Sequence, residues 1–260
     1  MDSKWQIPKA KYTEIKQKSK DYCLIIPVIN EGERIQNQLK KLVPYTNYVD
    51  IIIADGGSTD DSLNLDFLKS VNVSSLLVKE DTGKLGSQLR IAYSYALKQG
   101  YEGIITMDGN NKDGVEAIPN FINELKNGVD FIQGSRFVKG GVAINTPKSR
   151  HFAIKLIHAP FISLIAKEKF TDTTNGYRGY SRKYLLDERV LPFRDVFSTY
   201  ELLAYLSVRA SQLGMKTSEI PVTRAYPSDG HIPTKISSFS GNFELIKILF
   251  KLWSGEYNPK

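Results

Sequence analysis

The sequence predicts an α/β fold with a largely parallel central sheet flanked by helices. Through the first half of the chain, short apolar stretches alternate with segments of helical periodicity, which is the pattern of β-α-β units. Several of these stretches end abruptly in Asp, Asn and Gly, as strands do where they leave a sheet beside a ligand site. The chain has 260 residues, 41% of them hydrophobic, which is enough for one such domain with a substantial core.

Short apolar runs mark the strands expected in the first half. They cover residues 21–29, 48–54, 73–79, 103–107 and 129–137. Helical spacing lies between them at 31–42, 84–99 and 115–126. A further helix is expected to open at Ser58 or Thr59, because either side chain can cap it. We interpret residues 21–137 as the nucleotide-binding half of a single domain that spans 1–260.

The second half, residues 138–230, breaks this alternation. A strongly apolar segment at 150–166 is expected to pack in the core, with a membrane surface or a second subunit as alternatives. A polar and aromatic segment follows at 171–184, and then a helix at 198–213 and a strand at 217–225.

The chain closes on an amphipathic helix that we expect within residues 235–254. In its apolar part, residues 243–253, Glu244, Lys247 and Lys251 form one narrow polar stripe. One interpretation is that this helix docks on its own domain. The other is a basic-striped helix in the lipid headgroup region, which predicts peripheral contact with a membrane.

Charge and cysteine content limit the classes of partner and compartment. The formal net charge of +7 favours an anionic partner, such as nucleic acid, a phosphorylated small molecule or an acidic membrane surface. Nucleic acid is disfavoured because the basic residues are scattered. The single cysteine, Cys23, indicates a reducing compartment. No secretory leader or membrane-spanning stretch is recognised, so we expect a cytoplasmic protein, with the cytoplasmic face of a membrane as a further place of action.

The stretch GIITMDGNNKDG, residues 103–114, contains a candidate metal site. Asp108 and Asn110 follow a buried strand and offer two oxygen atoms to a hard divalent cation such as Mg2+ or Mn2+. Asp113 is near enough to join or to organise them. The structural alternative is a turn rich in Asp, Asn and Gly that closes the strand.

Polar residues follow each of the five expected strands. They include Asn30 and Glu31, with Pro27, at the first, Asp55 at the second, Lys84, with Gly83, at the third, Asp108 and Asn110 at the fourth, and Ser135 and Arg136 at the fifth. Parallel strands place their carboxyl ends along one edge, so this set predicts a site for a nucleoside diphosphate. Neither a P-loop nor a Gly-x-Gly-x-x-Gly motif is present, so the nucleotide must be held in another way.

The runs IIPVINEGE, ADGGSTD, MDGNN, GSRF and TNGYRGYSR, in this order, resemble the glycosyltransferase family 2 enzymes of GT-A fold. The nearest branch is that of the polyprenyl-phosphate glycosyltransferases, which includes the dolichol-phosphate mannose synthases. The resemblance covers residues 22–222. It implies an inverting transfer of a sugar from a nucleotide-sugar donor to an acceptor, with a polyprenyl phosphate as the expected acceptor.

The resemblance also implies roles for single residues. Pro27, Asn30 and Glu31 would border the nucleotide, Asp55 would contact the base, Lys84 and Gly109 would lie near the donor, and Asp108 would be the first metal aspartate. Two positions depart from the family pattern. Gly56 replaces a second aspartate after Asp55, and Asn110 replaces the second metal aspartate. A neutral amide contributes less charge to a cation, so cation affinity should fall or Asp113 should compensate.

The acceptor is expected to meet the second half of the chain. For a phosphate acceptor, arginines are the natural steering groups, and the candidates are Arg136, Arg150, Arg178 and Arg182. Asp108, Arg136 and Arg178 are the residues we expect to carry catalysis. A hydroxyl acceptor would need a base, for which Asp172 and Glu201 are candidates, although Glu201 also suits a helix start.

Two other functions stay open at this point. One is a soluble family 2 transferase that adds sugar to a polysaccharide or another hydroxyl acceptor. The other is a nucleotide-sugar-binding protein without turnover, which Gly56 and Asn110 suggest.

Overall fold

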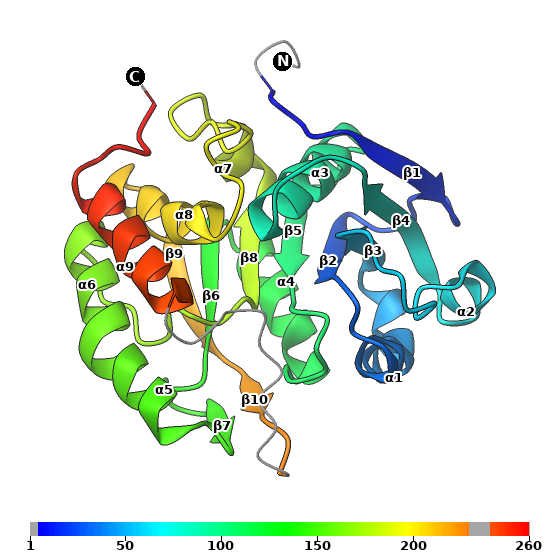
Figure 1. Cartoon of the computed structure of the whole chain (residues 1–260), viewed down its shortest axis with the longest axis horizontal. Coiled ribbons are helices and arrows are strands. Elements are labelled where there is room, and N and C mark those ends of the chain that lie inside the picture. The colour runs from blue at the N-terminus through cyan, green and yellow to red at the C-terminus, as the bar shows by residue number, and fades with distance from the viewer. Residues whose placement is uncertain (1–4, 229–239, 260) are drawn as a thin grey trace.

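One eight-stranded sheet with helices on both faces organises the structure, a computed structural model that describes residues 5–228 and 240–259 (Figure 1). The spatial order of the sheet is β1-β4-β3-β2-β5-β8-β6-β9. Its strands are β1 (Ala10–Glu14), β2 (Tyr22–Val28), β3 (Asp50–Asp55), β4 (Val73–Lys79), β5 (Gly103–Thr106), β6 (Phe131–Ser135), β8 (Arg178–Ser181) and β9 (Thr217–Pro221). A small second sheet pairs β7 (Val142–Ile144) with β10 (Thr223–Ala225) in parallel.

The helices cover two hydrophobic layers, one on each face of the sheet. They are α1 (Glu33–Leu42), α2 (Leu65–Ser70), α3 (Leu85–Lys98), α4 (Ile118–Lys126), α5 (Lys148–Ala153), α6 (Ala159–Ala166), α7 (Arg182–Leu186), α8 (Glu201–Gln212) and α9 (Ser240–Trp253). A π-helical turn (Ile154–His158) joins α5 to α6, and short 3-10 turns precede β3 (Val43–Asn47) and α4 (Val115–Ala117). One layer packs α3, α6, α8 and α9 on the sheet, and the other packs α1, α2 and α4. Alternate residues of the central strands, such as Ile25 and Ile26, enter opposite layers, which explains their continuous apolar runs.

Strand direction brings six carboxyl ends to one edge of the sheet, because β9 is also parallel to β6. β2 is parallel to β3 and to β5, and β3 is parallel to β4. β8 runs antiparallel between β5 and β6, so β6 points the same way as β5. The strand order reverses between β2 and β5, and such a reversal is where open α/β sheets bind ligands. The expected largely parallel sheet with flanking helices is confirmed.

Three local expectations were incomplete or wrong. β1, which is not among the strands expected from the sequence, pairs antiparallel with β4 at the edge of the sheet. β8 lies inside a segment that we read as polar and aromatic without a strand. The helix predicted to open at Ser58 or Thr59 begins instead at Leu65, where the Asn64 side chain accepts from the N–H of Asp66.

The apolar segment at 150–166 packs in the core on one face only. Ile154, Ile162 and Ile165 are buried, whereas Phe152 and Leu164 are more than half exposed. The expectation of core packing therefore holds for half of this segment.

The C-terminal helix is also divided between two environments. Of the expected range 235–254, residues 240–253 form α9, and 235–239 lie outside the described part of the chain. Leu249 and Leu252 are buried against the layer of α6 and α8, whereas Phe250 and Trp253 are exposed. Figure 1 places α9 beside α8 and α6 at one end of the sheet. Within residues 5–228 and 240–259, no helix combines the length and apolar character needed to cross a bilayer.

Candidate functional site

The ends of β2 and β3 are tied together by a network of short polar side chains. Asn30 accepts from the N–H of Thr59 at 2.8 Å, and its own N–H donates to the hydroxyl of Ser58 at 3.0 Å. The carboxylate of Asp55 accepts from the N–H of Ser58 at 2.9 Å and from its hydroxyl at 2.6 Å. The structure therefore brings Asn30 and Asp55 together, as predicted. Their roles toward a nucleotide stay predictions.

Packing against Gln88 explains why position 56 is a glycine, which the sequence alone did not reveal. A Cβ at Gly56 would lie 2.9 Å from Nε2 of Gln88 on α3. That same nitrogen donates to the carbonyl of Val28 at 2.8 Å and to that of Ala54 at 3.0 Å, so Gln88 joins the ends of β2 and β3. A buried amide thus takes the space that a second acidic side chain would need.

Gly109 and Lys84 extend the same edge of the sheet. A Cβ at Gly109 would approach the carbonyl oxygen of Pro27 to 3.0 Å, so glycine lets the β5 tip lie close against the end of β2. Lys84 directly precedes α3, is exposed, and its N–H donates to the carbonyl of Ser198 at 2.8 Å. Glu31, near the end of β2, pairs with Arg34 at 2.8 Å.

At the end of β5, Arg224 joins Asp108 to Asp113. Nη2 of Arg224 lies 2.9 Å from Oδ2 of Asp108, and Nη1 donates to both carboxylate oxygens of Asp113 at 2.7 and 2.6 Å. Nη1 also lies 3.2 Å from Oδ1 of Asn175. Burial disfavours the charged Asp108, but the adjacent Arg224 outweighs it and lowers the pKa of this carboxyl below its ordinary value. Burial likewise opposes the charged guanidinium, but the two carboxylates dominate and raise the pKa of Arg224 well above its ordinary value.

Two further residues shape the turn that carries Asp108. Gln38, fully buried on α1, donates to the carbonyl of Asp108 at 2.9 Å and accepts from the N–H of Asn111 at 2.7 Å. On the other side, a Cβ at Gly176 would lie 2.3 Å from Oδ1 of Asp108, so only glycine leaves room for that carboxylate.

The oxygen atoms at this turn fit a hard cation that takes its other ligands from elsewhere. The Asp108 side chain is 29% exposed and contacts Arg224 through Oδ2. Oδ1 of Asn110 is buried and has no hydrogen-bond partner among the described residues, as expected of an acceptor that awaits a ligand. Asp113 is turned to Arg224 and has no exposed side-chain surface, so it organises the site and does not extend the donor set. In the part of the chain that the structure describes, no group of three or more His, Cys, Asp or Glu could hold a metal.

At the end of β6, Arg136 forms a buried ion pair with Asp172. Nε lies 2.6 Å from Oδ2 and Nη2 lies 2.8 Å from Oδ1, and the two side chains are 1% and 0% exposed. Burial disfavours the cation, but hydrogen bonds and the charge of Asp172 raise the pKa of Arg136 above its ordinary value. Nη1 of Arg136 is buried without a hydrogen-bond partner among the described residues. This nitrogen can therefore still donate a hydrogen bond to a ligand.

Arg178 acts on the main chain in this structure. Its Nε, Nη1 and Nη2 donate to the carbonyls of Asn175, Leu203 and Thr173 at 3.0, 2.5 and 2.9 Å. It therefore fastens the loop before β8, which also carries Asp172 and Gly176. Its expected role toward a phosphate stays a prediction.

His158 contacts the same loop from the π-helical turn. Its Nδ1 lies 2.7 Å from the hydroxyl of Thr173. Burial, followed by the nearby charge of Arg178, lowers the pKa of His158 to about 4, so the imidazole is neutral at pH 7.

Three other candidates are placed differently. Arg150 donates to the hydroxyl of Tyr226 at 2.8 Å, just beyond Arg224 in the chain, and so borders the site. Arg182 was a wrong prediction: it donates to the carbonyl of Leu97 at 2.8 Å, at the end of β8 that pairs with the start of β5. Glu201 accepts from the N–H and hydroxyl of Thr199 at 2.6 and 2.7 Å. It is the first residue of α8, which agrees with the alternative that it serves the start of a helix.

The predicted set missed Arg224, Gln38 and Gln88. Arg224 lies inside an expected strand, and nothing in its local sequence distinguishes it from a surface arginine. Gln38 stands between apolar helix positions, and a polar residue on a buried helix face was the available signal.

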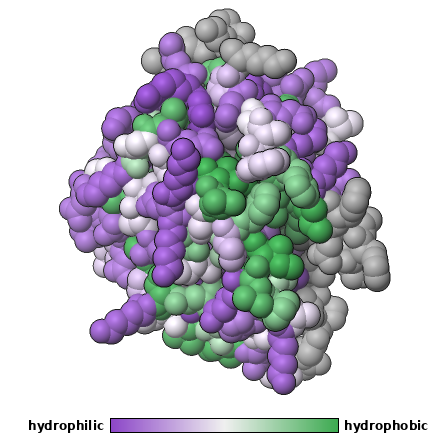
Figure 2. Space-filling model, turned by 90° about the vertical axis from the view of Figure 1, so that its left-hand side faces the viewer, coloured by the Kyte–Doolittle hydropathy of each residue, from purple (hydrophilic) through white to green (hydrophobic). Residues whose placement is uncertain are grey.

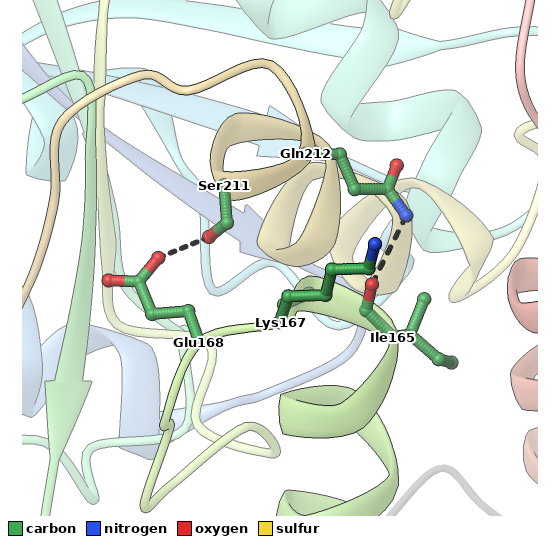
Figure 3. A pocket seen from close by; sticks show the side chains of 6 residues that line it. Ile165, Lys167, Glu168, Ser211 and Gln212 are labelled. Carbon is green, nitrogen blue, oxygen red and sulfur yellow. Dashed lines mark hydrogen bonds between the residues drawn. The ribbon is translucent and has the colours of Figure 1, made fainter.

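A separate surface pocket of about 430 Å3 lies between α6 and α8, away from the carboxyl ends of the strands (Figure 3). Ser211 and Gln212 of α8 and residues 165–168 after α6 line it. Its Glu168 accepts from Ser211 at 2.5 Å and from the hydroxyl of Thr217, the first residue of β9. Its polar groups thus bind one another, at the amino end of β9, far from the carboxyl ends described above.

Comparison with known proteins gives a consistent result. The family model described as Glycosyl transferase family 2 matches residues 23–187. The undecaprenyl-phosphate mannosyltransferase of Micrococcus luteus is 27% identical over 202 residues, which cover 76% of this chain and 81% of that protein. The polyprenol monophosphomannose synthase of Mycolicibacterium smegmatis is 27% identical over 203 residues, which cover 77% of this chain and 76% of that protein.

Solved structures share the fold at low sequence identity. Glucosyl-3-phosphoglycerate synthase from Mycobacterium tuberculosis, in complex with Mn2+, UDP and phosphoglyceric acid, superposes with a TM-score of 0.59 at 15% identity, covering 89% of this chain and 78% of that one. Mannosyl-3-phosphoglycerate synthase from Rubrobacter xylanophilus superposes with a TM-score of 0.64 at 11% identity, covering 90% and 73%.

Proposed function

The chain belongs to glycosyl transferase family 2 and has the GT-A fold, and from this premise we propose that it moves a sugar from a nucleotide-sugar donor to a polyprenyl phosphate. One observation carries the choice of acceptor: both carboxylates that could serve as a base are already engaged. Asp172 is bound to Arg136, and Glu201 is bound to Thr199. A phosphate oxygen is already anionic and needs no base, whereas a sugar hydroxyl does. The Micrococcus relative, an undecaprenyl-phosphate mannosyltransferase, and the Mycolicibacterium relative, a polyprenol monophosphomannose synthase, support the same acceptor class.

The donor diphosphate would lie at the carboxyl ends of β2, β3 and β5. Asn30 and Asp55 would face the nucleoside, and the exposed Lys84 would lie on the side of the phosphates. Asp108 and Asn110 would hold Mg2+ or Mn2+ through their oxygen atoms. When bound, such a cation offsets the negative charge that develops on the leaving diphosphate. The Mycobacterium glucosyl-3-phosphoglycerate synthase binds Mn2+ and UDP, which supports a divalent cation at a GT-A site in general.

The acceptor phosphate would be held by arginines on the other side of the site. Nη1 of Arg136 is the donor left over by the Asp172 pair, and the pair holds the guanidinium plane in place. Arg150 is held by Tyr226, and Arg178 holds the loop that carries Asp172. Groups fixed in this way can orient a phosphate oxygen for direct displacement at the sugar carbon, which inverts its configuration.

An exposed apolar surface beside this acceptor side would contact the membrane that carries the lipid. Figure 2 shows hydrophobic side chains gathered on the face formed by α5, the π-helical turn, α6 and α9. The most exposed members of this apolar surface are Phe152, Leu156, Ile157, Leu164, Phe250 and Trp253. Phe161 and Phe250 lie 5.9 Å apart between ring centroids and join the two helical segments. The membrane contact predicted for the C-terminal helix would therefore include α5 and α6, for whose segment a membrane surface was one of the alternatives.

Basic residues on the same helices favour an anionic bilayer as the partner of the apolar surface. Lys148, Lys155, Lys167, Lys247 and Lys251 belong to or directly follow these helices. A hollow of about 390 Å3 on α5 is lined by Lys148, Lys155, Phe152 and Leu156, together with Thr146 and His151. Ammonium groups next to exposed apolar side chains match the anionic headgroup and acyl boundary of a lipid surface.

A transfer assay with matched acceptors tests the proposed function. Donors labelled in the sugar are incubated with vesicles that contain either a polyprenyl phosphate or the corresponding polyprenol. We expect label in the lipid fraction with the phosphate and none with the alcohol. Equal transfer to the polyprenol or to a soluble saccharide would point to a hydroxyl acceptor, and donor binding without transfer to any acceptor would point to a binding protein.

A further inference from the structure

We propose that Arg224 is a built-in counter-ion of the donor site, which holds Asp108 until nucleotide arrives and thereby makes divalent-cation binding depend on the nucleotide. The inference rests on the proposed function, because it concerns the cation and diphosphate which that function requires. Nothing in the sequence pointed to Arg224, and the structure places it between the two aspartates of the β5 turn.

The two ends of the guanidinium are held unequally. Nη1 donates to both oxygens of Asp113 at 2.7 and 2.6 Å, and Asn175 adds a contact at 3.2 Å. Asp113 has a fully buried side chain, so this end is anchored inside the protein. Nη2 makes a single contact of 2.9 Å with Asp108, whose side chain is 29% exposed. Arg224 can therefore release Asp108 and stay in place.

The local charges nearly cancel before any ligand binds. Two carboxylates, Asp108 and Asp113, are paired with Arg224, and the buried Lys112 adds a second basic group beside them. Asn110, at the second metal position, is neutral. A divalent cation alone therefore meets a site with little net negative charge, and Asp108 must be taken from Arg224 to bind it.

A nucleoside diphosphate changes this balance. It brings several negative charges of its own and supplies oxygen ligands, which the chain offers sparingly. Nη2 of Arg224 then exchanges the Asp108 carboxylate for phosphate oxygen while Nη1 keeps Asp113. Arg224 is thus a positioning residue for Asp108 and the device that couples metal binding to nucleotide binding.

Binding of Mn2+ followed by the EPR signal of the free ion tests this directly, without reference to activity. With wild-type protein we expect little loss of signal for Mn2+ alone. With UDP or GDP present we expect at least tenfold tighter binding, after the loss caused by the nucleotide without protein is subtracted. A paired substitution, Arg224→Met with Asp113→Asn, removes the buried cation together with its anchor, so that no buried charge is left unpaired. This variant should bind Mn2+ without nucleotide at least tenfold more tightly than the wild type.

A matched control is the exposed pair Arg189 and Asp187, which lie 2.7 Å apart. Arg189→Met with Asp187→Asn should leave Mn2+ binding unchanged. Equal Mn2+ affinity of the wild type with and without nucleotide would overturn the inference, as would an unchanged affinity in a folded Arg224/Asp113 variant. If that variant does not fold, the wild type still rejects the inference when its Mn2+ affinity is the same with and without nucleotide. Failure of UDP, GDP and their sugars to bind at all would instead reject the proposed function.

Discussion

Gln38 on α1 fixes the main chain of Asp108, because its Nε2 donates to the Asp108 carbonyl at 2.9 Å. The other end of the same amide accepts from Asn111 at 2.7 Å, so one buried side chain clamps both ends of the turn after β5. The position of the Asp108 carboxylate therefore depends on a helix that is distant in sequence and contributes no group to the ligand.

Replacing Gln38 by Met should destabilise the protein and loosen the site together. The carbonyl of Asp108 and the N–H of Asn111 would lose their partner, at a cost of about 2 kcal/mol in the free energy of unfolding. Urea unfolding measures this loss. Asn37→Met, at an exposed neighbour on α1, should change stability by less than about 0.5 kcal/mol. Equal effects of the two substitutions would contradict the role of Gln38.

Gly176→Ala should displace Asp108 while the fold is retained. The new Cβ would lie 2.3 Å from Oδ1 of Asp108, so the carboxylate must move. We expect the Mn2+-dependent part of nucleotide affinity to fall at least tenfold in calorimetry. Gly100→Ala serves as the control, since its φ of 77° strains alanine but no atom lies within 4 Å. That control should lose stability and keep nucleotide affinity; a loss of affinity in both would show that strain alone is responsible.

His158 should make stability depend on pH. Its folded-state pKa of about 4 lies below the ordinary value of 6.5, so the unfolded chain binds the proton more readily. Stability from this group is complete above pH 6.5 and is lost as the pH falls toward 4, by about 2 kcal/mol between pH 7 and pH 5. His158→Asn should flatten this part of the dependence in urea unfolding at the two pH values. Thr173→Ser, which keeps the hydroxyl partner, should behave like the wild type, and an unchanged slope in His158→Asn would exclude His158 as its source.

The apolar surface over α5, α6 and α9 should govern membrane binding. Leu156→Ser combined with Trp253→Ser removes two exposed apolar side chains and should weaken co-sedimentation with anionic vesicles at least tenfold. Each apolar side chain that enters the lipid contributes roughly 1 kcal/mol or more to the free energy of binding. Leu65→Ser combined with Tyr48→Ser is the matched control, because these exposed residues lie outside the apolar surface of α5, α6 and α9. Point substitutions are preferable to deletion of α9, whose Leu249 and Leu252 belong to the core. Equal binding by the two variants would place the contact elsewhere.

Sequence reasoning located the parts of the site that depend on strand direction. Asn30, Asp55 and Asp108 each follow an apolar run, and parallel strands end at one edge, so their proximity could be predicted. β8 could not be read in the same way, because its four residues, RGYS, contain Arg178 and lack an apolar run. It is a strand because β5 and β6 pair with it on both sides.

The groups that hold the site together come from long-range contacts. Arg224 meets Asp113 across 111 residues, and Gln38 meets Asp108 across 70. No spacing rule connects such pairs, since their contact exists only once the sheet is assembled. For the same reason the sequence assigned Arg136 and Asp172 to separate roles, whereas the fold joins them in one ion pair.

Thermal unfolding with nucleotide sugars, with and without Mn2+, tests the central claim that these strand ends form a donor-diphosphate site. At a hundredfold excess over its Kd, a cognate UDP- or GDP-sugar should raise the Tm of the wild type by roughly 5 °C, and Asp108→Ala should erase the part of the shift that requires Mn2+. Absence of a shift with every nucleotide sugar, or a full Mn2+-dependent shift in Asp108→Ala, would contradict it.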